Sequence, residues 1–67
     1  MAVIHIDPET MNGEPVFVGT RVPLHNLFDA LEHGRSLEEF LESFPTVTRQ
    51  EAIAALEEAK AALLDKL

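Results

Sequence analysis

Four polar residues near the starts of two predicted helices have the types and spacing to contact nucleic acid. Thr48, Arg49 and Gln50 stand in the expected first turn of the last helix, and Arg35 stands just before the preceding helix, where it could touch a phosphate. Arginine can read guanine and glutamine can read adenine, and the first turn of a recognition helix reaches the base edges. The alternative is structural, with Thr48 as a helix cap and Arg49 and Gln50 as solvated surface residues.

A second group, His25, Asp29 and His33, has the spacing of metal ligands on one helix face. The face that they share is predicted to point toward solvent, and no fourth ligand is evident. The sequence holds no Ser/His/Asp or Cys/His pattern and no glycine-rich phosphate loop. We therefore expect no metal, no cofactor and no enzyme activity.

The charge of the chain limits what it can bind. Twelve acids stand against five basic residues, which gives a formal net charge of −7. Proteins that bind nucleic acid gain much of their affinity by displacing counterions from phosphates, so an acidic chain is at a disadvantage there. Acidity favours a basic protein partner instead, with ordinary solubility as the alternative reason for the carboxylates.

Length and composition favour a small dimeric protein. A chain of 67 residues makes one domain and buries only about 60% of its unfolded surface, so a monomer would be marginal. There are no cysteines, and no apolar run approaches the roughly 20 residues of a membrane span. We expect a cytoplasmic protein that stays out of the membrane and associates with a second copy.

The N-terminal part predicts two short strands and a turn. Residues 2–7 and 16–18 are β-forming, and Asn12 followed by Gly13 could take positive φ in the loop between them. Gly19 and Thr20 then supply a turn, and Pro23 is suited to the first position of a helix. A lone pair of strands is marginal in water, so this hairpin needs a packing surface.

Three helices are predicted after this turn. The first covers residues 23–33 and ends at Gly34 as a left-handed cap. Two capping boxes then start the second helix, which ends before Pro45, and the third, which covers residues 49–66. The boxes are Ser36 with Glu39 and Thr48 with Glu51.

Apolar residues recur at helical spacing in all three helices. The third helix also carries many alanines, which favour helix formation. Its leucine-rich end leaves more apolar surface than one small core can cover, so we expect a homodimer formed through the hairpin and the end of the third helix. The apolar positions are Leu24, Leu27, Phe28 and Leu31, then Leu37, Phe40, Leu41 and Phe44, then Ile53, Leu56, Leu63, Leu64 and Leu67.

The glycines and prolines at the predicted turns and helix ends belong to one motif. It consists of Gly13, Pro15, Gly19, Thr20, Arg21 and Pro23, followed by a Gly-Arg-Ser run at residues 34–36 and a Pro-x-x-Thr run at residues 45–48. In this motif the sequence resembles a family of small prokaryotic proteins known as domain of unknown function four hundred thirty-three, and the match that includes it covers nearly the whole chain, from about Ile6 to Ala59. The resemblance implies a homeodomain-like helix-turn-helix and an antitoxin-like protein, often encoded beside a nuclease-type toxin. It implies no enzyme activity.

Together these observations predict a mainly α-helical domain with a short N-terminal β-hairpin over residues 1–22 and a three-helix unit over residues 23–67. We expect Arg21 to be structural, either pairing with a carboxylate such as Asp7 or capping backbone carbonyls. The leading functional hypothesis is an antitoxin-like dimer that binds a toxin and its own operator DNA. A stand-alone transcriptional regulator and a purely structural dimer are the alternatives.

Overall fold

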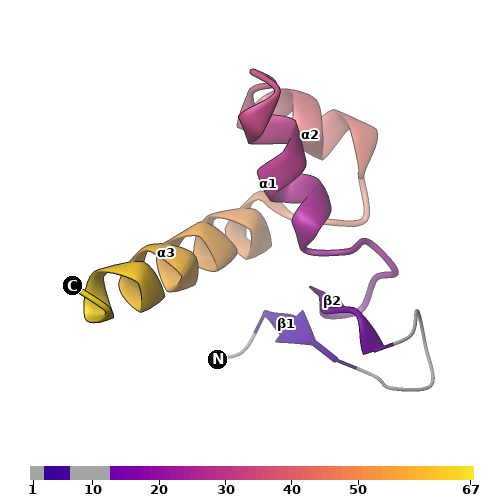
Figure 1. Cartoon of the computed structure of the whole chain (residues 1–67). Helices are drawn as coiled ribbons and strands as arrows, with labels where there is room; N and C mark the ends of the chain where they lie inside the picture. The colour runs from indigo at the N-terminus through magenta and orange to yellow at the C-terminus, as the bar shows by residue number, and fades with distance from the viewer. Residues whose placement is uncertain (1–2, 7–12) are drawn as a thin grey trace.

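Three helices and a minimal antiparallel sheet make up the structure, a computed structural model that describes residues 3–6 and 13–67 (Figure 1). The prediction of a mainly helical fold with a short N-terminal pair of strands is confirmed. The predicted roles of Asp7 and Asn12 lie outside the described residues. The elements in chain order are β1 (Ile4–His5), β2 (Val16–Phe17), α1 (His25–Glu32), α2 (Leu37–Ser43) and α3 (Arg49–Asp65).

β2 is the central segment of the sheet because it pairs on both edges. On one edge it runs antiparallel to β1, with Ile4 opposite Phe17 and His5 opposite Val16. On the other edge Val16 forms a β-bridge with Pro23. The segment that leads into the first helix is therefore held against the sheet.

This bridge shifts the start of the first helix. The Leu24 N–H donates to the Pro15 carbonyl at 2.9 Å, beside the bridge between Val16 and Pro23. Since proline has no N–H, the residue after it, Leu24, supplies this donor, while the Val22 carbonyl before it accepts from the Phe17 N–H at 3.1 Å. Pro23 thus pairs with β2 through an isolated bridge, and α1 begins at His25, later than the predicted Pro23.

The turn after β2 depends on Gly19 and Thr20. The Thr20 N–H donates to the Phe17 carbonyl at 3.0 Å, and Gly19 has φ 77° at the third position of the turn. A type II turn requires positive φ there, which glycine adopts without strain. The Thr20 hydroxyl also donates to the Phe17 carbonyl at 2.9 Å and accepts from the Val22 N–H at 3.0 Å. One side chain therefore ties the two sides of the turn together.

Both predicted capping boxes are present at the starts of α2 and α3. The Ser36 hydroxyl accepts from the Glu39 N–H at 3.1 Å, while the Ser36 N–H donates to the Glu39 carboxylate at 2.8 Å. Thr48 and Glu51 make the same exchange at 3.1 and 3.0 Å. Each box satisfies backbone donors that the first turn of a helix leaves without partners.

Gly34 ends α1 as predicted, with φ 82°. Its N–H donates to the Leu31 carbonyl at 3.1 Å, and the Arg35 N–H donates to the Ala30 carbonyl at 2.9 Å. This pair of bonds is the Schellman arrangement, which satisfies carbonyls at the end of a helix. It also turns the chain sharply, so that α2 lies beside α1 (Figure 1).

The core lies where β2 meets the helices. The rings of Phe17 and Phe40 are tilted by 50° with centroids 6.2 Å apart, within the range of favourable aromatic pairs. Val47, in the turn between α2 and α3, also points into this core. The buried members of the cluster are Phe17, Leu27, Phe40, Val47, Ala52 and Ala55.

α3 packs against the core through alanines rather than through its larger residues. Ala52 and Ala55 are buried, whereas Ile53 is 42% exposed. Of the residues predicted to share the apolar face of this helix, Leu56 packs against the core, and Ile53, Leu63, Leu64 and Leu67 are exposed. Short side chains allow a helix to approach its neighbours closely, which explains why alanines occupy the contact.

The second half of α3 extends away from α1 and α2 (Figure 1). Every residue from 57 to 67 is exposed. Leu63, Leu64 and Leu67 are 65%, 59% and 96% exposed. In the part of the chain that the structure describes, no helix is long and apolar enough to cross a membrane.

Candidate functional site

Thr48 caps α3. Its hydroxyl oxygen accepts from the Glu51 N–H at 3.1 Å and lies 3.2 Å from the Glu51 carboxylate, to which it can donate. These contacts confirm the structural role that the sequence offered as an alternative. A contact between Thr48 and a base stays a prediction.

Arg49 is paired with an acid on the preceding helix. Its guanidinium donates to the carboxylate of Glu38 in the first turn of α2, which links α2 to the start of α3. The hydrogen bond from Arg49 holds the pKa of the Glu38 carboxyl below its ordinary value, and Glu38 raises the pKa of Arg49. Both side chains are about half exposed or more, so the pair contributes little to stability. Its importance is that a phosphate or base must compete with Glu38 for the donors of Arg49.

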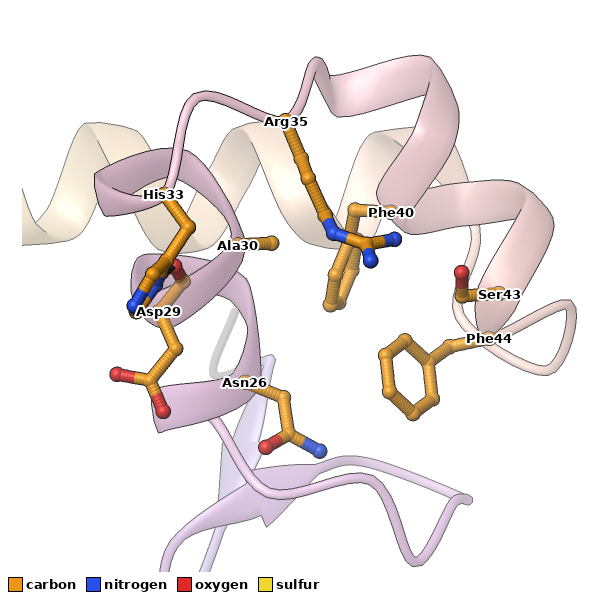
Figure 2. A pocket seen from close by; sticks show the side chains of 8 residues that line it. All are labelled: Asn26, Asp29, Ala30, His33, Arg35, Phe40, Ser43 and Phe44. Carbon is orange, nitrogen blue, oxygen red and sulfur yellow. Dashed lines mark hydrogen bonds between the residues drawn. The ribbon is translucent and has the colours of Figure 1, made fainter.

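Gln50 and Arg35 occupy different surroundings. Gln50 is exposed next to Arg49 in the first turn of α3. Arg35, just before α2, instead extends into a hollow between α1 and α2 (Figure 2). Thr48, Arg49 and Gln50 do not line this hollow. The structure thus gathers three of the predicted contact residues at the start of α3 and places the fourth in a separate concavity.

The hollow has a volume of about 350 Å³ and combines polar and aromatic groups. The rings of Phe40 and Phe44 lie with centroids 5.1 Å apart on the α2 side, and α1 supplies an amide and a carboxylate (Figure 2). The sequence indicated only that the two phenylalanines share a helix face, which is also the signature of a core stripe. The lining residues are Asn26, Asp29, Ala30, His33, Arg35, Phe40, Ser43 and Phe44.

The histidines of α1 take part in local hydrogen bonds. The imidazole of His25 lies 2.9 Å from the Asp29 carboxylate through Nδ1 and 2.7 Å from the Glu14 carboxylate through Nε2. The hydrogen bond to Asp29, with the negative charge of Glu14, raises the pKa of His25. His33 donates from Nδ1 to the backbone carbonyl of Asp29 at 2.7 Å. Among the described residues, no group of three potential ligands is arranged to hold a metal ion.

The Gly-Thr-Arg motif is architectural where the structure describes it. Thr20 and Gly19 build the turn, Pro15 accepts a backbone hydrogen bond, and Pro23 pairs with β2. Gly13 also has positive φ, at 76°. Arg21 is exposed, and the carboxylate predicted to pair with it, Asp7, lies outside the described residues.

Carboxylates outnumber basic groups among the exposed residues that the structure describes. Basic residues are few, and two of the five are already in ion pairs, Arg49 with Glu38 and Lys60 with Glu57 at 3.0 Å. The exposed acids occur on all three helices, so the negative charge is spread over the helical unit. They are Asp29, Glu32, Glu38, Glu39, Glu42, Glu57, Glu58 and Asp65.

These features define a small, mainly helical, acidic protein in which a Gly-Thr-Arg turn joins a minimal sheet to three helices. Residues 4–59 match the family described as Protein of unknown function (DUF433), and the chain belongs to that family. No curated protein and no solved structure matches the chain.

Proposed function

We propose that this protein is an antitoxin-like protein that binds a basic, nuclease-type toxin through its acidic surface. The observation that carries the proposal is the excess of exposed carboxylates over free basic groups, together with the pairing of Arg49 by Glu38. The class of partner comes from the resemblance of the Gly-Thr-Arg motif described above. Complementary charge speeds the encounter of two proteins and excludes partners of the wrong sign.

Operator DNA is the second candidate ligand. Here α2, the turn at residues 44–48 and α3 would act as a homeodomain-like helix-turn-helix, with the start of α3 in the major groove. The supporting observation is that Arg49 and Gln50 are exposed in the first turn of α3. Because the free protein is acidic, we expect a bound basic toxin to strengthen DNA binding by neutralising part of the surface.

The two alternatives to an antitoxin-like role predict different behaviour. A stand-alone regulator would bind its operator specifically without any protein partner. A purely structural dimer would bind neither DNA nor a second protein. We prefer the antitoxin-like proposal to the regulator and the structural dimer, because the negative charge of the chain suits a basic protein partner better than a phosphate backbone.

The direct test is affinity purification of the protein from its native host and identification of the protein that co-elutes. We expect a basic protein whose nuclease activity falls when it is bound. Glu32→Lys combined with Glu42→Lys reverses two exposed charges on α1 and α2. We expect these changes to weaken the complex about tenfold or more at low salt, and less at high salt.

Gln50→Ala is the control, because it alters an exposed polar residue without changing charge. It should leave the affinity for the toxin unchanged. An acidic partner, or equal binding by the charge-reversed variant and the wild type, would rule out recognition through the acidic surface.

A further inference from the structure

We infer that two copies of this chain associate reciprocally, each placing the end of its α3 in an apolar groove of the other. The α3 tail is defined here as residues 60–67. The hairpin groove is a concavity of about 320 Å³ lined by Ile4, Leu24, Phe28, Ala55, Glu58 and Ala59. It brings together β1, the start of α1 and the middle of α3.

The α3 tail presents apolar side chains that the described part of the chain does not cover. All of its residues are exposed, including the large side chains of Leu63 and Leu64. The tail continues a helix whose first half packs against the core and is rich in alanine, so it stays helical without packing of its own. Its leucines are therefore available to a second molecule.

Phe28 marks the hairpin groove as a docking surface. It is only partly buried, lies outside the buried core cluster and lines two neighbouring hollows, of about 320 and about 160 Å³. Leu24 lines both hollows as well. Aromatic side chains, phenylalanine among them, are enriched in protein interfaces.

The α3 tail and the hairpin groove form one continuous surface on each molecule, which suits a symmetric dimer. Ala59 in the groove, Leu63 and Lys66 stand at i, i+4 and i+7 and so share one face of α3. In a twofold dimer the same surface patch of each copy forms the interface. The two α3 helices can therefore cross at this face, with Leu63 of each copy in the hairpin groove of the other.

The charge of the α3 tail favours a second copy of the chain over a basic toxin as its binding partner. The side chains of residues 60–67 include two of the five basic residues and one of the twelve acids, a net charge of +1, whereas residues 1–59 carry −8. A weakly positive tail is attracted to the acidic body of a second copy and to Glu58 in its groove. A basic toxin would favour the acidic remainder of the surface instead.

The test is sedimentation equilibrium of the free protein, without toxin or DNA, so its outcome is independent of the proposed function. Wild type should be a dimer at about 100 µM and dissociate on dilution. Leu63→Glu and Ala59→Arg should each weaken the dimer about tenfold or more, since both positions are exposed in the single chain and the changes act on the interface. Circular dichroism should show that both variants keep their helices.

Ile53→Glu is the matched control, because Ile53 is an exposed apolar residue of the same helix outside the groove. It should remain dimeric. Mixing Leu63→Glu with Ala59→Arg should restore a heterodimer, since one intact tail then meets one intact groove. A wild-type monomer at this concentration, a dimer that tolerates both changes, or a mixture that stays monomeric would overturn the inference.

Discussion

The guanidinium of Arg49 at the start of α3 donates a hydrogen bond to the carboxylate of Glu38 in the first turn of α2. Both residues are exposed, so the contact adds little to stability, but it determines what Arg49 can meet. A DNA phosphate or a guanine must compete with Glu38 for the same donors. The acidic residue thus opposes DNA binding both by its charge and by occupying the arginine.

This pairing predicts opposite effects for its two members on DNA binding. Arg49→Ala should weaken specific binding about tenfold to a hundredfold if Arg49 reads a base. Glu38→Gln should strengthen binding, because it removes a negative charge and frees Arg49. Mobility-shift titrations with DNA from upstream of the gene, with and without the toxin, provide the measurement. Equal binding by both variants and the wild type would exclude Arg49 as a reader.

Gly19→Val should destabilise the protein by about 1–3 kcal/mol through backbone strain. Among the described residues, beyond Gly19 and its two chain neighbours, no heavy atom lies within 4 Å of the position that a Cβ would take at Gly19, so the cost comes from φ 77° and not from a clash. Gly19→Asn should cost less, since asparagine tolerates positive φ better than a β-branched residue. Gln50→Ala should leave the thermal melt nearly unchanged, and the reverse ranking would contradict this account.

Thr20→Val should cost about 1–2 kcal/mol, because it removes a hydroxyl that donates to the Phe17 carbonyl and accepts from the Val22 N–H. Valine has nearly the same shape, so packing should change little. Thr20→Ser keeps the hydroxyl and serves as the control. Denaturant unfolding of the three proteins gives the comparison, and equal midpoints for Thr20→Val and wild type would show that the hydroxyl is dispensable.

His25 should titrate above its ordinary pKa of 6.5, because Asp29 accepts a hydrogen bond from it and Glu14 adds negative charge. A raised pKa in the folded state means that this stabilisation is fully present below pH 6.5 and is lost as the pH rises through the folded pKa. Imidazole proton shifts followed by NMR measure the pKa directly. Asp29→Asn and Glu14→Gln should each lower it, and a wild-type value at or below 6.5 would refute the assignment.

The sequence predicted the parts of the fold that depend on neighbouring residues. The capping boxes at Ser36 and Thr48, the left-handed cap at Gly34 and the turn at Gly19 and Thr20 are all confirmed. Each arises from groups three or so residues apart, whose hydrogen bonds form whatever the rest of the chain does. The candidate site was predictable to the same extent, since Thr48, Arg49 and Gln50 do lie together at the start of α3.

Only the tertiary structure determined the contacts between segments that are distant in the sequence. It buried Ala52 and Ala55 rather than Ile53 in the core, paired Pro23 with β2 through an isolated bridge and brought Glu38 to Arg49. Periodicity shows which residues share a helix face, but the distance between elements selects the face that is buried. For this reason the ion pair between Arg49 and Glu38 appears only in the folded chain, whereas the uncovered leucines at the end of α3 were already predicted from the sequence.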